Sequence, residues 1–253
     1  HREKIGDGIL MERFLQKAEI RDKSLLQSRS YPFSIPAIRK MGEVEFHPQA
    51  TFFIGENGPG KSTLLEGIAV QFGFNPEGGT RNFNFSTYAS HSELWRHLRL
   101  TKGISRPKDG FFFRAESFYN VATEIENLSE EGMGRPIRES YGGNLHNRSH
   151  GESFFALLQN RLGGHGLYLF DEPEAALSPL RQLAMLRRMR ELAENGSQLI
   201  IATHSPILLA YPDCWIYEFS QKGIRRVEYE ETEQFRITRD FLNNYPKALE
   251  ELF

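Results

Sequence analysis

The sequence predicts an α/β fold in which helices flank a mainly parallel sheet. Short apolar runs have the length of buried strands, and segments rich in helix formers lie between and beside them. The predicted strands are 51–54, 167–170 and 199–202, and the predicted helices are 62–72, 153–162 and 179–195. Strands that alternate with helices in this way are typical of a parallel sheet covered on its faces. The length of 253 residues, 39% of them hydrophobic, is enough for one large domain with a substantial core.

The remaining segments are less regular. We expect an edge strand within 11–22, a helix at 92–100, a strand at 111–113 and a helix at 117–128. A hairpin at 215–230 and a C-terminal helix complete the chain, and a long polar loop follows residue 128.

These elements predict a single domain over 11–253 with two lobes. Lobe I comprises about 11–74 and 166–253, and lobe II comprises about 75–165. Residues 1–10 precede Met11, the first convincing start, and are interpreted as an expression remnant or an upstream extension.

Composition excludes several classes of protein. The 31 basic and 33 acidic side chains give a net charge of -2, which excludes a generally basic protein that coats nucleic acid. The single cysteine, Cys214, excludes an internal disulfide framework and fits a reducing compartment. No apolar run is long enough to cross a bilayer, and the start lacks the apolar segment of a signal peptide. We therefore expect a cytoplasmic protein without membrane insertion.

A phosphate-binding loop is the strongest motif. It lies between the strand at 51–54 and the helix at 62–72, and matches G-x-x-x-x-G-K-[ST]. Its residues are Gly55, Glu56, Asn57, Gly58, Pro59, Gly60, Lys61 and Ser62, with Thr63 following. Glycines let the backbone approach phosphates, Lys61 reaches the β- and γ-phosphates, and the Ser62 hydroxyl is a magnesium ligand. Pro59 has no N–H and so removes one donor from the loop.

A second motif ends the strand at 167–170. Asp171 follows the apolar run and is placed to hold magnesium opposite Ser62. Glu172 is a candidate general base that polarises the attacking water. Many strands end in acids, so this pattern gains its meaning from the phosphate loop and is then interpreted as a Walker B element.

The order GENGPGKST, SHGES, LYLFDEPEAALS and IIATHSP resembles the ATPase domain of the ABC superfamily. The residues of these motifs resemble those of the RecF, SMC and OLD-type ATPases, and of stand-alone bacterial predicted ATPases, more than those of transporter subunits. The resemblance covers about residues 40–210 and implies a P-loop NTPase fold with an irregular, signature-bearing lobe. It also implies ATP and Mg2+ as cofactors.

The resemblance implies further site residues. Ser149, Gly151 and Glu152 match the signature motif, which in this family caps ATP bound to the phosphate loop of a second subunit; Arg148 and His150 depart from its usual pattern. An alternative interpretation, a capping box of Ser149 and Glu152, is equally compatible with the sequence. His204 matches the switch histidine that contacts the γ-phosphate.

Several weaker matches stay open. Ser178 takes the position of the family's D-loop aspartate, but Ser178-Pro179 is also a typical helix start. Residues 114–116 stand where a Q-loop glutamine is expected. Arg81 is a candidate phosphate contact and surface packing an alternative, and Tyr31 and Phe33 are candidates for stacking on adenine or for core packing.

The sequence therefore predicts an ATPase that acts as an ATP-dependent homodimer and a switch. DNA or an effector protein is a candidate partner, because six Lys or Arg lie within 93–114 against two acids, although a solvated face explains them more simply. Three roles compete: a DNA-associated or defence-related ATPase, a nucleotide-sensing subunit of a toxin or defence complex, and, with least support, a transporter-energising subunit.

Overall fold

The computed structural model describes residues 13–58, 60–80, 92–118, 120–121, 123 and 150–253, with residue 150 described by its backbone alone. Its centre is a six-stranded sheet with the strand order β5-β6-β7-β3-β8-β9. All neighbours in this sheet are parallel except β8 and β9, which form an antiparallel hairpin. The strands are β3 (Ala50–Ile54), β5 (Asp109–Arg114), β6 (Gly166–Asp171), β7 (Gln198–Ala202), β8 (Cys214–Ser220) and β9 (Gly223–Val227). The predicted α/β class with a mainly parallel sheet is confirmed.

The inner strands of this sheet are buried on both faces. In β3, Phe52 and Ile54 belong to one apolar cluster, whereas Phe53 between them belongs to another. In β6, Tyr168 and Leu169 divide in the same way. Side chains alternate between the faces of a strand, so a strand covered on both faces is apolar throughout. This is why the inner strands appear in the sequence as unbroken apolar runs.

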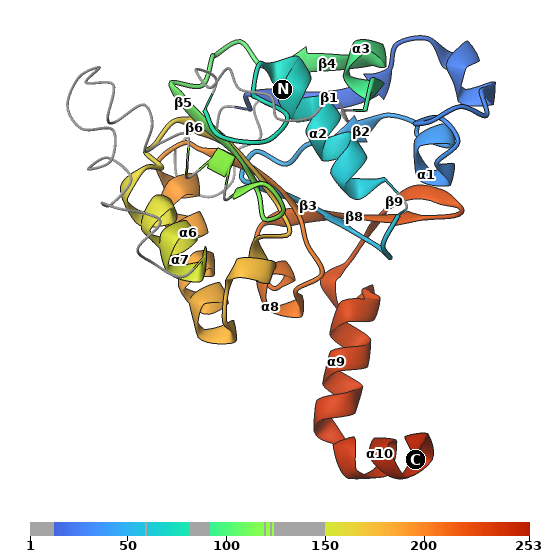
Figure 1. Cartoon of the computed structure of the whole chain (residues 1–253), viewed down its shortest axis with the longest axis vertical. Coiled ribbons are helices and arrows are strands. Elements are labelled where there is room, and N and C mark those ends of the chain that lie inside the picture. The colour runs from blue at the N-terminus through green and yellow to red at the C-terminus, as the bar shows by residue number, and fades with distance from the viewer. Residues whose placement is uncertain (1–12, 59, 81–91, 119, 122, 124–149) are drawn as a thin grey trace.

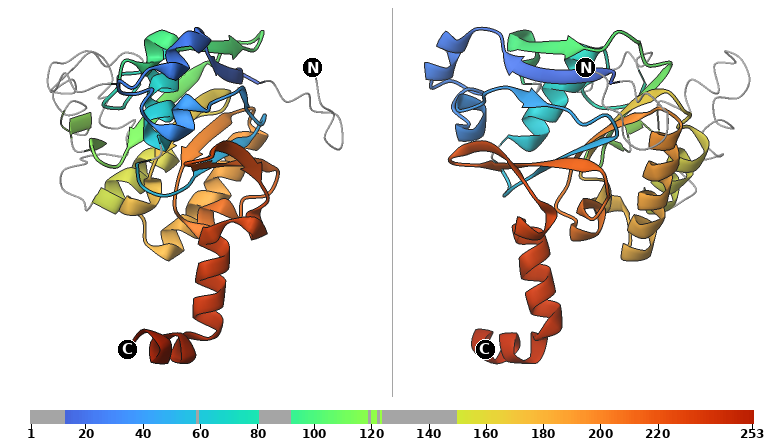
Figure 2. Two further views of the ribbon diagram at one scale, coloured as in Figure 1. Left: turned by 90° about the vertical axis from the view of Figure 1, so that its right-hand side faces the viewer. Right: turned by 180° about the vertical axis from the view of Figure 1, so that it is seen from behind.

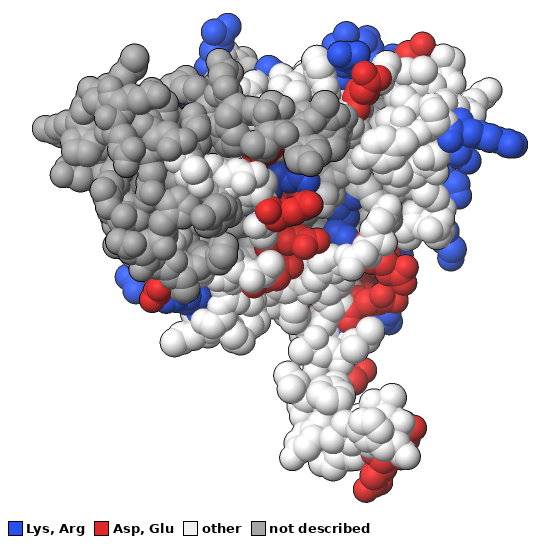
Figure 3. Space-filling view, in the orientation of Figure 1, with Lys and Arg blue, Asp and Glu red and all other residues white. Residues whose placement is uncertain are grey.

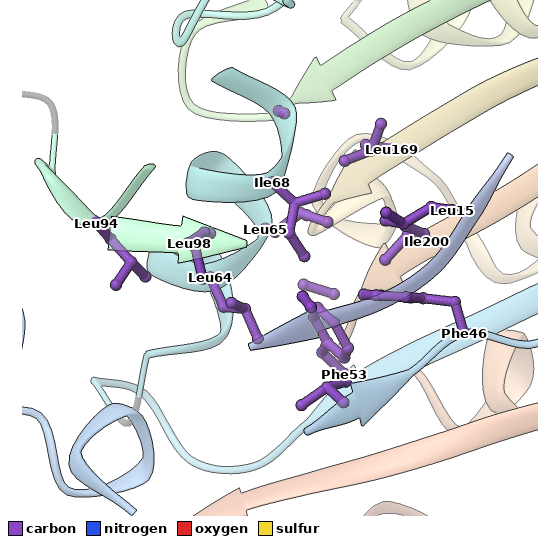
Figure 4. Packing of buried hydrophobic residues seen from close by; sticks show 14 of the residues in the cluster. Leu15, Phe46, Phe53, Leu64, Leu65, Ile68, Leu94, Leu98, Leu169 and Ile200 are labelled. Carbon is purple, nitrogen blue, oxygen red and sulfur yellow. The ribbon is translucent and has the colours of Figure 1, made fainter. Parts of the chain in front are cut away.

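One face of the sheet is covered by α2 (Lys61–Phe72) and by a second, three-stranded antiparallel sheet. That sheet has the order β2-β1-β4, with β1 (Leu15–Ile20), β2 (Val44–Glu45) and β4 (Leu98–Lys102). Figure 4 shows the core between the two sheets, where Leu65 and Ile68 of α2 lie close to Phe53, Leu169 and Ile200 of the large sheet. The short α1 (Pro36–Arg39) and α3 (Leu94–His97) border this layer (Figure 1).

The opposite face is covered by α6 (His150–Asn160), α7 (Pro179–Glu194) and α8 (Pro206–Leu209), which lie together on the other side of the sheet in Figure 1. After the β8–β9 hairpin, α9 (Glu233–Asn243) and α10 (Tyr245–Leu252) project away from the body as an arm (Figure 2). Short 3-10 turns at Lys23–Gln27, Pro173–Ala176 and Tyr229–Glu231 complete the fold. Within the described residues, none of the helices combines the length and the apolar character needed to cross a bilayer.

Most predicted elements agree with the structure, two differ, and one cannot be compared because it lies mostly outside the described residues. The strand within 11–22 is not an edge strand: β1 is the central strand of the antiparallel sheet. The helix expected at 92–100 is only one turn, because the chain extends at Leu98 to form β4, which pairs with β1 along the full length of that strand. The helix expected at 117–128 lies mostly outside the described residues.

The predicted lobe boundaries do not coincide with a break in hydrogen bonding. β4 and β5 fall within predicted lobe II, residues 75–165, yet β4 pairs with β1 and β5 pairs with β6. Both partner strands lie in predicted lobe I. Residues 98–114 therefore belong structurally to the two sheets.

Candidate functional site

The predicted phosphate loop follows the carboxyl end of β3. Gly55 has a φ of 132°, and a Cβ at this position would lie 2.2 Å from the carbonyl oxygen of Phe219 in the neighbouring strand β8. A side chain is therefore excluded by conformation and by space. The glycine lets the chain leave the sheet beside β8 and turn into the loop.

The loop ends at the start of α2. Its N-cap, Gly60, has no side chain to accept hydrogen bonds from the first turn of the helix. Four N–H groups at a helix start lack intrahelical partners and favour an anion. Lys61, the first helical residue, is 4% exposed, and its Nζ donates to the carbonyl oxygens of Gly55 (2.9 Å) and Glu56 (2.7 Å). Burial lowers the pKa of Lys61, and the nearby acids Glu172 and Asp171 act against this.

Ser62 and Asp171 are brought together as the sequence predicted. Ser62 Oγ, in the first turn of α2, donates to Asp171 Oδ1 at the carboxyl end of β6 over 2.9 Å. Asp171 is 6% exposed, and burial raises its pKa to about 6, against the lowering effects of Arg114 and of the Ser62 hydrogen bond. The positive charge around this carboxylate therefore does not fully offset its desolvation.

Glu172 and His204 face each other across the same strand ends. Glu172 has a φ of 51°, the left-handed conformation that non-glycine residues adopt at a cost of about 1–3 kcal/mol. Its Oε1 lies 3.7 Å from Nε2 of His204, which follows β7. Among the described residues, that Nε2 is buried without a hydrogen-bond partner. The pKa of His204 is lowered by burial first and by Lys61 second, so the ring favours its neutral form.

Glu174 completes the site and was missing from the sequence-based prediction. It lies in the 3-10 turn after Glu172, and its carboxylate accepts from the Thr203 hydroxyl (2.8 Å) and from the backbone N–H of His204 (2.6 Å). It thus fixes the turn on which His204 sits. The third acid of the DEPE sequence was the only available signal, and its partner lies 30 residues further along the chain.

Two of the predicted signature residues, Gly151 and Glu152, lie at the start of α6. A Cβ on Gly151 would lie 2.3 Å from the carbonyl oxygen of Ala176, so the helix start packs directly against the turn after Glu172. Glu152 is half-exposed and forms an ion pair with Arg181 of α7 at 3.7 Å. Both contacts are made within one chain, and they join the signature segment to the turn that carries the predicted general base.

Some of the weaker site predictions can be compared with the structure, and others lie outside the described residues. Phe33 is buried and packs edge-on against His97, so it is a core residue, whereas Tyr31 is 61% exposed. The Ser178 hydroxyl accepts from the N–H of Arg181 at 3.4 Å, so Ser178 caps α7. Pro59, Arg81 and Ser149 lie outside the described residues, as does the side chain of residue 150.

The basic segment 93–114 is not a uniform cationic surface. Arg96 pairs with Glu93 (2.9 Å) and Arg99 lies 3.6 Å from Glu19. Arg114 is turned inward, with 16% of its side chain exposed, and lies against the buried Glu66 and Asp171. On the face shown in Figure 3, acidic and basic side chains lie beside one another near the middle.

These residues fit a nucleotide with its magnesium ion. The uncapped helix start and the buried ammonium of Lys61 suit a phosphate chain, and one hydroxyl with one carboxylate suits Mg2+, which takes its other ligands from phosphates and water. A cavity of about 660 Å3 opens beside residues 55–58 and is bordered by the β8–β9 hairpin and the start of α9. When bound, Mg2+ supplies charge neutralisation and an orienting contact for the phosphates.

Comparisons with known proteins point to one superfamily. Residues 153–210 match the family described as "AAA domain, putative AbiEii toxin, Type IV TA system". The vitamin B12 import ATP-binding protein BtuD of Vibrio cholerae is 30% identical over 202 residues, which cover 73% of this chain and 77% of that protein. The hemin import ATP-binding protein HmuV of Idiomarina loihiensis is 27% identical over 178 residues, or 62% of this chain and 66% of the relative, just under two thirds of its length.

Two solved structures that align with this chain are each 16% identical to it in sequence. CbiO1 of Clostridium perfringens, described as part of the ABC transporter complex cbiONQ, aligns with a TM-score of 0.48 over 95% of this chain and 99% of its own. The SMC head domain of Thermotoga maritima aligns with a TM-score of 0.41 over 85% and 98%. The sequence relatives confirm the predicted resemblance to the ABC superfamily. The chain belongs to the ABC superfamily of ATPases.

Proposed function

We propose that the chain binds Mg-ATP at residues 55–63, with Ser62 and Asp171 on the magnesium side, and hydrolyses it. The observation that carries this proposal is the 2.9 Å contact between Ser62 Oγ and Asp171 Oδ1. It joins the phosphate loop to the predicted Walker B strand from positions 109 residues apart in sequence. A hydroxyl and a carboxylate meeting beside an uncapped helix start are the donor set that a magnesium-bound phosphate chain requires.

In this proposal Glu172 is the general base. Its carboxylate is half-exposed, at the end of β6 and next to the predicted metal ligand, so it is open to a water molecule. His204 presents on the same side a buried Nε2 that has no hydrogen-bond partner among the described residues, and it is proposed to contact the γ-phosphate. The pairing of these groups is supported by the 3.7 Å approach between them.

We further propose that two copies close around ATP, with Ser149, Gly151 and Glu152 of each copy facing the phosphate loop of the other. The proposal is supported by Gly151, which packs against the turn that follows Glu172. Movement of α6 on contact with a second copy would therefore reach the general base. ATP then acts as a switch that holds the copies together until hydrolysis.

Glu172→Gln tests base and assembly together. Loss of the general base should slow hydrolysis by about 10²–10⁴-fold while ATP binding stays near normal. Unhydrolysed ATP should then keep the variant dimeric, as measured by light scattering with and without ATP. Adding Ser149→Arg should return it to a monomer. Glu93→Gln, an exposed glutamate paired with Arg96, serves as the control and should behave as wild type. Wild-type turnover by the Glu172→Gln variant would contradict the assignment of the base, and a monomer at saturating ATP would contradict the assembly.

For the biological role we propose a DNA-associated or defence-related process, supported by a family description that names a toxin of a type IV TA system. The competing role, energising a transporter, is supported by relatives named for import of hemin and vitamin B12. Double-stranded DNA should stimulate hydrolysis at low salt and lose this effect at high salt if phosphates are contacted. Unchanged turnover with DNA at every salt concentration would favour the transporter role or the nucleotide-sensing role.

A further inference from the structure

Arg114 occupies an unusual position at the carboxyl end of β5. It is in register with Asp171 at the end of the neighbouring strand β6, so both side chains emerge at the edge of the sheet that carries the site. Its side chain is 16% exposed. A guanidinium stays charged at any ordinary pH, so this position holds a fixed positive charge.

Two buried carboxylates flank that charge. Arg114 Nη1 donates to Glu66 Oε2 of α2 over 2.8 Å and to the carbonyl oxygen of Pro76 over 3.1 Å. On its other edge, Nε lies 3.7 Å from Asp171 Oδ2, too far for a hydrogen bond. Within the described part of the chain, this buried Nε has no hydrogen-bond partner. Glu66 therefore holds the guanidinium through a short contact, while Asp171 feels its charge without being bonded to it.

The same carboxylate, Asp171, is engaged by Ser62 through its other oxygen. Arg114 and the proposed metal thus both interact with the carboxylate of Asp171. A cation beside a metal ligand repels a second cation and so opposes metal binding. Glu66 offsets this opposition, since its negative charge lies against Arg114 and also acts on Asp171. The side chain of Glu66 is 10% exposed, so water screens this effect little.

We propose that the Arg114–Glu66 pair sets the affinity of the Ser62–Asp171 site for Mg2+. Arg114 is a resident cation beside Asp171 that opposes the arrival of the metal, and Glu66 limits this repulsion. Both act through Asp171 and are positioning residues. The inference rests on the proposed binding of Mg-ATP at this site.

Opposite charge changes test the proposal. With a non-hydrolysable ATP analogue bound, the 253-residue chain is titrated with Mn2+ as the metal probe, and bound Mn2+ is followed by electron paramagnetic resonance. Arg114→Gln removes the repelling charge and should lower the Mn2+ concentration for half-saturation, by up to about tenfold for nearby charges in a partly buried site. Glu66→Gln keeps an acceptor for the N–H of Ser92 but removes the offsetting charge, and should raise that concentration by a similar factor.

Two further variants separate charge from structure. Arg114→Lys retains the charge and should bind Mn2+ close to the wild-type concentration, and the double variant Arg114→Gln with Glu66→Gln should also return toward it. If both single variants shift in the same direction, the pair has only a structural role and the proposal is overturned. Failure of the wild-type protein to bind the analogue with Mn2+ would instead overturn the proposed function. If Arg114→Gln does not fold, the rise expected for Glu66→Gln and the wild-type affinity of Arg114→Lys still decide the matter.

Discussion

The two sheets of the protein share the apolar core that contains α2 but differ in what their ends carry. In the six-stranded sheet, β3, β6 and β7 run parallel, so their carboxyl ends lie at one edge. In the three-stranded sheet, neighbouring strands run in opposite directions, and none of the predicted site residues lies on it. Parallel strands gather the residues that follow each of them in one place, which an antiparallel sheet does not.

The antiparallel sheet nevertheless holds the site indirectly. Its buried face packs against α2, the helix whose first turn holds Lys61 and Ser62 (Figure 4). The direction of that helix therefore depends on contacts from both sheets. One sheet supplies the chemical groups, and the other restrains the helix that carries two of them.

One buried side chain of the six-stranded sheet makes several hydrogen bonds to residues in and beside β1 and β2. Gln198, at the amino end of β7 and fully buried, accepts from the N–H groups of Phe14 (3.0 Å) and Leu15 (2.9 Å). Its amide nitrogen donates to the carbonyl oxygens of Leu15 (2.8 Å) and His47 (3.0 Å). All four hydrogen-bonding positions of the amide are used.

Gln198→Leu should therefore have the largest effect on stability. It leaves several buried backbone groups without partners, and at about 1–3 kcal/mol for each unsatisfied group we expect a total loss of about 4 kcal/mol. Urea denaturation measures the loss. Gln71→Leu is the control, because Gln71 makes one hydrogen bond, to the Leu98 carbonyl, and should cost about 1 kcal/mol or less. Equal costs for the two variants would show that the hydrogen bonds of Gln198 add no more stability than the bond of Gln71.

Lys61→Ala should have the next largest effect, on binding. The variant loses the ammonium that lies over the phosphate loop, and we expect ATP affinity to fall at least about 100-fold, or about 2.7 kcal/mol. Calorimetric titration measures it. Lys17→Ala, in β1 and paired with Glu43, removes a lysine from the other sheet and should leave the affinity unchanged. A Lys61→Ala protein with wild-type affinity would remove the phosphate-loop assignment.

The parallel sheet was predicted better from the sequence than the antiparallel sheet. The inner parallel strands are apolar on both faces, so β3, β6 and β7 stand out as continuous runs. β4 was mistaken for helix, because Leu98–Lys102 carries two charged residues and only one of its faces is buried. Its strand conformation is decided by pairing with β1, about 80 residues earlier in the chain, which is information that a local pattern lacks.

For the site, the motif residues could be predicted from the sequence, but the contacts that support them could not. The loop and the acids after β6 were predicted, because strand ends and a spaced motif mark them. The supporting contacts were not predicted: Arg114 meets Glu66 across 48 positions, and Glu174 meets the turn at His204 across 30. Such contacts depend on which strands become neighbours, and a local motif does not contain the strand order.

Glu174→Gln should have the smallest of these effects, because it alters a partner of the site and none of its proposed phosphate or metal contacts. The amide retains one acceptor, so one of the bonds to the Thr203 hydroxyl and the His204 N–H persists and the other is lost. Losing one hydrogen bond to a charged group corresponds to about 1.5–3 kcal/mol, and if half of that restrains His204 we expect hydrolysis to slow about tenfold. ATP affinity should change less than twofold, and steady-state kinetics with calorimetry separate the two. Glu194→Gln, a surface glutamate paired with Arg190, is the control.

A double-mutant cycle decides whether Glu174 acts through His204. In a His204→Ala background the imidazole that Glu174 orients is absent, so adding Glu174→Gln should slow hydrolysis little further. Additive losses in the cycle would mean that Glu174 influences hydrolysis by another path, such as the conformation of Glu172 two residues earlier. In that case Glu174→Gln should also change the turnover of variants that lack the histidine, and the strained backbone at Glu172, with its φ of 51°, would be the element to examine next. Non-additive losses would instead connect the parallel strand ends through one carboxylate, from the turn after β6 to the turn after β7.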